Sequence, residues 1–122
     1  MVVNLSSILL VAVGGAFGCV GRFLIIRQVI KLNPTVFPLG TMVVNIFGSL
    51  LVGYILGRYG TQHSTRIFFV NGMAGGFTTF SAFSWDAMQL LHRGQHVLAA
   101  VYIIASVALA LACVILGWKL AQ

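Results

Sequence analysis

The residues best suited to chemistry in this chain lie in one stretch, Asn71 to Asp86, which reads NGMAGGFTTFSAFSWD. Three glycines, Gly72, Gly75 and Gly76, each disfavour a helix by about 1 kcal/mol relative to alanine. We therefore predict a broken helix here, with the break between residues 72 and 78. Irregular backbone and polar groups are tolerated at membrane depth only inside protein or beside water. The stretch is predicted to line an ion pathway.

The side chains after the glycines suggest what the pathway carries. Phe80, Phe83 and Asp86 recur every three residues, so they form a stripe along a helix that resumes after the break. Aromatic rings have positive edges, and two edges would offer weak, dehydrated contacts to a small anion. The sequence has no ring of carboxylates for a cation. The alternative for the two rings is ordinary packing. The alternative for Asp86 is a carboxylate that is solvated or capped at one mouth.

Asn45 is the polar residue outside this stretch that matters most. Asn45, Ser49, Gly53 and Gly57 recur every four residues and therefore share one helix face. An unsatisfied amide in hydrocarbon costs several kcal/mol, so Asn45 must face protein or water. It would either donate N–H groups to the same anion or join two helices.

These residues must be positioned by helices that cross a membrane. The chain has 122 residues, of which 60% are hydrophobic and 7% charged, whereas soluble domains carry about 25% charged residues. With about 20 apolar residues per span, we predict an all-α integral membrane protein with one four-helix domain over residues 1–122, the third helix broken in mid-membrane. The first residues carry no basic leader, so we expect a span there, not a cleaved signal peptide. The predicted spans are Leu5 to Ile26, Leu39 to Gly57, Ile67 to Leu91 and Val97 to Leu116.

Small residues and charges set the assembly. Gly14 and Gly18 form a GxxxG pair on which another backbone can pack closely. Arg22, one turn further on, is either an anchor at the membrane edge or a positive charge at a vestibule that concentrates anions. The net charge of +6 does not indicate nucleic acid, because the basic residues are scattered near span ends. The two cysteines lie in apolar runs and predict packing, not a metal site.

The loop charges are nearly balanced between the two sides of the membrane. One side carries three basic residues, Arg58, Arg66 and Lys119. The other side carries Arg27, Lys31 and Arg93, and Arg22 would be a fourth. The positive-inside rule therefore predicts no preferred orientation. Two oppositely oriented copies would pair about a two-fold axis in the membrane plane, as an antiparallel dual-topology homodimer.

Two motifs carry a resemblance to a known family. GTMVVN at 40–45 and GGFTTFSAFS at 75–84 resemble the fluoride channel family Fluc, also called CrcB. The resemblance implies a channel, not an enzyme, that lets cytoplasmic fluoride leave by passive electrodiffusion. It also implies a multi-pass protein of a bacterial or archaeal inner membrane, and an antiparallel homodimer with two fluoride pores and a central structural sodium ion.

The same resemblance assigns roles by motif position. It implies a fluoride pathway made of Asn45, Phe80, Phe83, Thr79, Ser81 and Ser106. It places Arg22 and Asp86 at the vestibule, and it assigns sodium binding to the main-chain carbonyls of Gly75 and Thr78. Span four departs from the family pattern, because Ala110 and Val114 stand where relatives carry hydroxyls.

A second hypothesis is a proton-coupled exporter of the small multidrug type, which is also a small dual-topology protein. That class depends on a carboxylate in its first span, and this sequence has none there. Asp86 is the only candidate for proton coupling. A non-transporting assembly protein, suggested only by the positive charge, would leave the broken third span unexplained.

Overall fold

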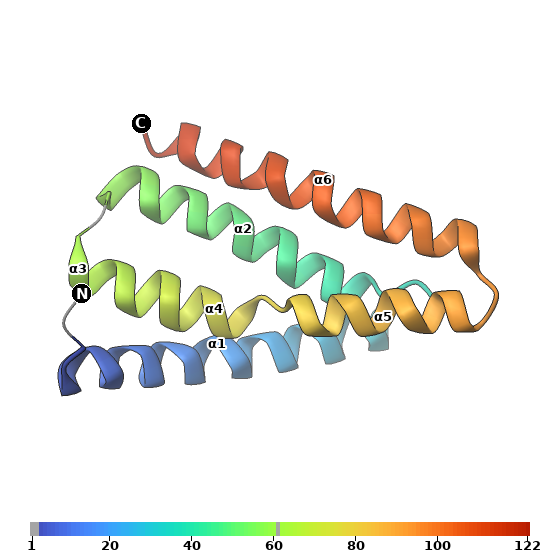
Figure 1. Ribbon diagram of the computed structural model, residues 1–122, viewed down its shortest axis with the longest axis horizontal. Coiled ribbons are helices and arrows are strands. Elements are labelled where there is room, and N and C mark those ends of the chain that lie inside the picture. Colours follow the sequence, from blue (N-terminus) through green and yellow to red (C-terminus); the bar gives the residue numbers. More distant parts are fainter. Residues whose placement is uncertain (1–2, 61) are drawn as a thin grey trace.

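The computed structural model describes residues 3–60 and 62–122, and all of its regular structure is helical. The elements are α1 (Leu5–Leu32), α2 (Leu39–Tyr59), α3 (His63–Thr65), the π-helix η1 (Arg66–Ala74), α4 (Gly75–Phe77), α5 (Phe80–His92) and α6 (His96–Leu120). In Figure 1, α3 to α5 follow one another along a single line beside α1, α2 and α6. The prediction of an all-helical chain is confirmed, and four helical passages fit the structure.

Three of the helices are long and apolar enough to cross a membrane. The mean hydropathy of their best windows is 2.1 for α1, 1.9 for α2 and 2.7 for α6. The third passage is divided into shorter helices, so none of its pieces reaches that length alone. A multi-pass membrane protein follows.

The first helix is longer than predicted. It continues past Ile26 to Leu32, so Arg27 and Lys31 lie on the helix and not in a loop. The prediction ended the span at the first loop charges, but Arg and Lys are good helix formers. The helix ends at Asn33, where the following Pro34 disfavours helical backbone in the residue before it.

The third passage is broken, but the break lies after the glycines, not at them. The chain is helical through Gly72, Gly75 and Gly76. It becomes extended at Thr78, where ψ is 159°, and at Thr79, where φ is −154° and ψ is 117°. The prediction that residues 72–78 form the break was therefore wrong, except at its last residue. Nine residues before α4 form a π-helix, a form that is rare and frequently found at functional sites.

The glycines of the third passage serve close packing against α1. Gly14 and Gly18 of α1 are buried, and a Cβ atom on Gly76 would lie only 2.6 Å from the carbonyl oxygen of Gly15. A Cβ atom on Gly72 would lie 3.0 Å from the carbonyl oxygen of Val11. The predicted small-residue face on α1 is confirmed, and its partner is η1 with α4. Contacts of the same kind join α2 and α6, where a Cβ on Gly53 or Gly117 would meet main-chain oxygen.

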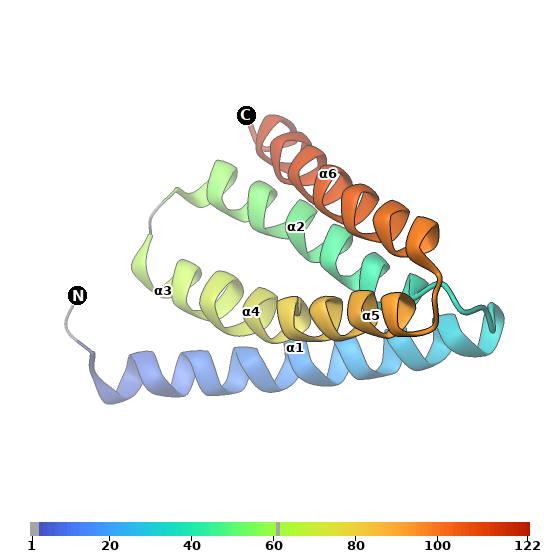
Figure 2. The same ribbon diagram turned by 45° about the vertical axis from the view of Figure 1, so that its right-hand side comes forward.

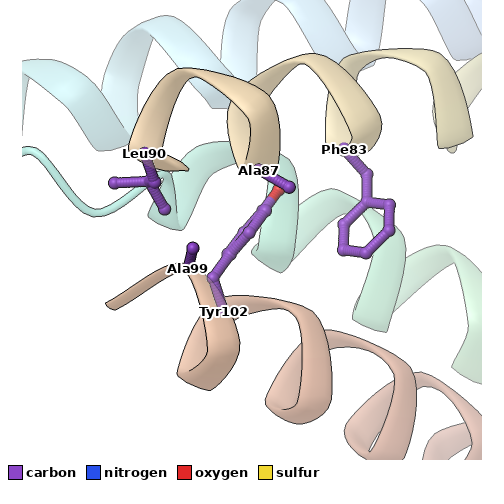
Figure 3. Packing of buried hydrophobic residues seen from close by; sticks show 5 residues of the cluster. All are labelled: Phe83, Ala87, Leu90, Ala99 and Tyr102. Atoms are coloured by element: carbon purple, nitrogen blue, oxygen red, sulfur yellow. The ribbon is translucent and has the colours of Figure 1, made fainter. Parts of the chain in front are cut away.

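The second half of the third passage packs on α6 instead. Phe83, Ala87 and Leu90 of α5 meet Ala99 and Tyr102 of α6 (Figure 3). The Tyr102 side chain is fully buried and its ring meets the edge of Phe37 at a centroid distance of 5.6 Å. The two halves of the broken helix thus have different neighbours.

We predict that Gly18→Ala destabilises the protein by about 1–3 kcal/mol, the usual cost of overpacking, because its methyl group would collide with the main-chain carbonyl of Met73. Gly15→Ala is the matched control, since the nearest atom to its Cβ is 3.9 Å away. The free energy of unfolding in mixed detergent micelles measures both. Equal stabilities would show that α1 does not pack on the third passage this closely.

Candidate functional site

The break is held by the side chain of Asn45 on α2. Its Nδ2 donates to the carbonyl oxygen of Thr79 at 3.0 Å, and its Oδ1 accepts from the main-chain N–H of Thr79 at 2.7 Å. The amide therefore supplies both a donor and an acceptor to one extended residue, as a neighbouring strand would. Because the Thr79 N–H is used here, it does not bond to the carbonyl of Gly75 four residues earlier, as it would in a continuous α-helix.

Arg22 reaches the same break from α1. Its Nη1 donates to the carbonyl oxygen of Thr78 at 3.2 Å, and the Thr78 hydroxyl and N–H both donate to the carbonyl oxygen of Ala74 at 2.9 Å. A cation at the C-terminal end of a helix is favourable because of the helix dipole. Arg22 thus caps the first half of the broken helix. The sequence suggested a membrane-edge anchor or a vestibule charge, and neither interpretation included this contact.

The second half begins with its own cap. Thr79 is the N-cap of α5, and its Oγ1 accepts from the N–H of Ala82 at 3.1 Å. Its hydroxyl also lies 3.2 Å from the Oγ of Ser81. These two predicted pathway hydroxyls are therefore adjacent, with Thr79 buried and Ser81 exposed.

A cavity of about 310 Å³ lies beside the break. It is lined by Asn45, Ser49, Val52, Thr78, Thr79, Phe80, Phe83, Ser106, Val107, Ala110 and Val114. The structure thus brings together all the predicted fluoride-pathway residues except Ser81. Ser81 does not line the cavity itself, but its hydroxyl contacts that of Thr79, which does. Ala110 and Val114, the two positions on α6 that lack the hydroxyls of the family pattern, form an apolar part of the cavity wall.

Ser106 is the most unusual residue of the lining. Its side chain is 5% exposed, and within residues 3–60 and 62–122 its Oγ has no hydrogen-bond partner. A buried polar group without a partner costs about 1–3 kcal/mol. The hydroxyl is therefore available to a hydrogen-bond acceptor in the cavity.

The two phenylalanines of the lining differ in burial. Their ring centroids are 5.5 Å apart, with the planes tilted by 39°. Phe83 is 9% exposed and also packs on Tyr102 at 5.3 Å, whereas Phe80 is 78% exposed. Packing within this chain accounts for Phe83 but not for Phe80.

Asp86 lies outside the cavity lining. The Tyr102 hydroxyl donates to its Oδ2 at 3.3 Å, so the side chain is capped by a neighbouring helix. Tyr102 was missed by the sequence analysis, although a tyrosine inside a strongly apolar span signals a buried hydrogen bond. Ser49 was placed on the Asn45 face but not in the site. Its Oγ donates to the carbonyl oxygen of Asn45 at 2.7 Å.

A cavity at a helix break, formed by helices that cross a membrane, defines a small multi-pass membrane protein of the channel or transporter class. A family model described as "CrcB-like protein, Camphor Resistance (CrcB)" matches residues 9–118, and the chain belongs to this family.

The relatives agree over nearly the whole chain. It is 42% identical over 120 residues to the "Fluoride-specific ion channel FluC" of Rhizobium meliloti (strain 1021), covering 95% of this chain and 96% of the relative. It is 47% identical over 116 residues to a protein of that name from Cereibacter sphaeroides (strain ATCC 17029 / ATH 2.4.9), with coverage of 93% and 92%. These relatives are named as ion channels, which are transporters and not enzymes. The predicted family and the prediction that the chain is not an enzyme are confirmed.

We predict that Asn45→Ala opens the break, because the main-chain N–H and C=O of Thr79 both lose their partner. Each unpaired group costs about 1–3 kcal/mol. Hydrogen exchange at residues 79–82 measures the opening and should become faster. Ser49→Ala is the control, since its hydroxyl bonds to the main chain of Asn45 and not to the break. Unchanged exchange in Asn45→Ala would refute this role.

Proposed function

We propose that this protein is a fluoride-specific channel through which cytoplasmic fluoride leaves the cell passively. The observation that carries the proposal is the cavity at the break, where Asn45, Phe80, Phe83 and the unpaired hydroxyl of Ser106 meet. The names of its relatives supply the ion. The proposed location is the inner membrane of a bacterium.

The chemistry of the lining favours an anion. A side-chain amide has two N–H donors, and the Nδ2 of Asn45 spends one of them on Thr79, so the other remains for a ligand. Ser106 adds an O–H donor, and the rings of Phe80 and Phe83 would add their positive edges. Among the described residues, none that lines the cavity carries a carboxylate. A small anion that loses its water would therefore meet donors in place of negative charge.

A second copy completes the site in this proposal. Phe80 is largely exposed, and the hydroxyl side chains of Ser81 and Ser84 are exposed on the same helix. Both hydroxyls have partners within the chain, Thr79 Oγ1 for Ser81 and the Phe80 carbonyl oxygen for Ser84. The uncovered Phe80 ring is therefore the feature that a partner would cover. The near balance of basic residues between the two sides of the membrane favours an antiparallel partner, with one pore for each copy.

The break also suits the predicted sodium ion. The Gly75 carbonyl is released from helical bonding because the Thr79 N–H turns to Asn45, and Gly75 is exposed. The Thr78 carbonyl accepts from Arg22 and keeps a second lone pair. One chain would contribute two oxygens, so an antiparallel pair would surround the ion with four. A bound sodium ion would tie the two copies together through their main chains.

Fluoride efflux from proteoliposomes tests the proposed function, with chloride as the control anion. We expect fluoride flux without chloride flux. Fluoride flux that is absent, or equalled by chloride, would refute the proposal.

Two substitutions test the rings. Phe80→Ile and Phe83→Ile should each abolish fluoride flux while the dimer still assembles, because isoleucine fills space but has no positive edge. Phe17→Ile on the exposed face of α1 is the matched control and should leave flux unchanged. Normal flux in both ring variants would mean that the rings only pack.

Removal of sodium tests the central ion. We expect the dimer to dissociate more readily when sodium is replaced by a large organic cation, because four carbonyl oxygens would then lack their shared partner. The dimer fraction on dilution into excess lipid measures this. If neither the dimer fraction nor the fluoride flux changes when sodium is replaced, the proposed central sodium ion is refuted.

A further inference from the structure

The outer face of the end of α1 carries a groove that the channel function does not use. Its volume is about 600 Å³ and it is lined by Phe23, Leu24, Arg27, Gln28, Ile30 and Lys31. At 1.5 Å per residue, the 28 residues of α1 span about 42 Å, more than the roughly 30 Å of a hydrocarbon core. In Figure 2 this end of α1 lies at the same end of the molecule as the turn between α5 and α6. The groove therefore lies where a long helix leaves the hydrocarbon.

One of the two cations of this groove is held in place. Phe23, Arg27 and Lys31 are four residues apart and so follow one another along one helix face. The Arg27 guanidinium lies over the Phe23 ring, 5.5 Å from its centroid, which is within range of a cation–π interaction. Arg27 is thus folded onto the groove instead of extending freely into water. Two cations and the Gln28 amide border one small space.

The chain itself cannot neutralise these two cations. It contains a single carboxylate side chain, Asp86, and that carboxylate bonds to Tyr102 on another helix. A second copy would bring the same shortage of negative charge, so charge complementarity disfavours a protein copy in this groove. The counter-charge must come from the surroundings. The exposed side chains of Phe23, Leu24 and Ile30 offer the apolar half of the groove to an occupant that is itself part hydrocarbon.

From this combination we propose that the groove is a binding site for an anionic phospholipid. The phosphate lies between Arg27 and Lys31, and an acyl chain follows Phe23 and Leu24 toward the middle of the membrane. Because Arg27 is positioned by Phe23, binding depends on this ring as well as on the charge. The site is separate from the cavity at the break and does not rest on the ion that passes there.

Native mass spectrometry of the intact protein in neutral detergent tests the proposal. The protein is titrated with phosphatidylglycerol and with phosphatidylcholine of the same acyl chains. We expect tighter retention of phosphatidylglycerol, and Arg27→Gln/Lys31→Gln should weaken it at least roughly tenfold, since each basic residue contributes about one factor of five. Arg93→Gln/Lys119→Gln removes the same charge elsewhere and is the matched control. All four side chains are exposed, so both variants are expected to fold.

Further arms separate the possible occupants. Phe23→Leu keeps the apolar wall but loses the ring, and should weaken retention several-fold. Excess inorganic phosphate should not displace the lipid; displacement would indicate a free-anion site and overturn the proposal. Equal losses in the two double variants would indicate diffuse surface attraction, and no loss in Arg27→Gln/Lys31→Gln would exclude the groove. Either result overturns the proposal. It is also overturned if the dimer of Arg27→Gln/Lys31→Gln dissociates while its retention of lipid is unchanged.

Discussion

The pair of hydrogen bonds between Asn45 and Thr79 is the interaction on which the rest of the structure depends. Extended backbone in a membrane passage leaves main-chain groups without their helical partners, and hydrocarbon offers none in their place. One planar amide supplies both missing partners. The break lies where α2 presents an asparagine. The cap on α5, the released carbonyl of Gly75 and the cavity all follow from that position.

The break is also the point at which the third passage changes neighbours. Its first half packs on α1 through glycines whose absent side chains let two backbones meet. Its second half packs on α6 through Phe83 and larger apolar side chains. A straight helix could not satisfy both neighbours. Arg22 of α1 and Asn45 of α2 both bond to the short extended segment, and the cavity lies between α2, the break and α6.

The distribution of charge matches this design. Asp86 is held by Tyr102 outside the cavity lining. Arg22 donates a hydrogen bond to the carbonyl oxygen of Thr78. The described lining residues carry hydrogen-bond donors and aromatic rings, without a full charge of either sign. In the proposed channel, such a lining would attract a small anion without trapping it, as conduction requires. The remaining basic residues lie toward the helix ends, and the proposed lipid groove uses two of them.

The sequence by itself determined the membrane class, the helical passages, the small face of α1 and the presence of a broken third helix. These features depend on composition and on the helical period, which are local. Its motifs also identified the family, and five of the predicted pathway residues line the cavity, namely Asn45, Thr79, Phe80, Phe83 and Ser106. Only the tertiary structure decided that the break falls at Thr78 and Thr79, that Arg22 caps it, that Tyr102 holds Asp86 and that Ser106 lacks a partner. Each of these depends on the rotation and register of helices distant in sequence. The glycines show the physical reason: the same residue can break a helix or let it pack closely, and the neighbouring helix decides which.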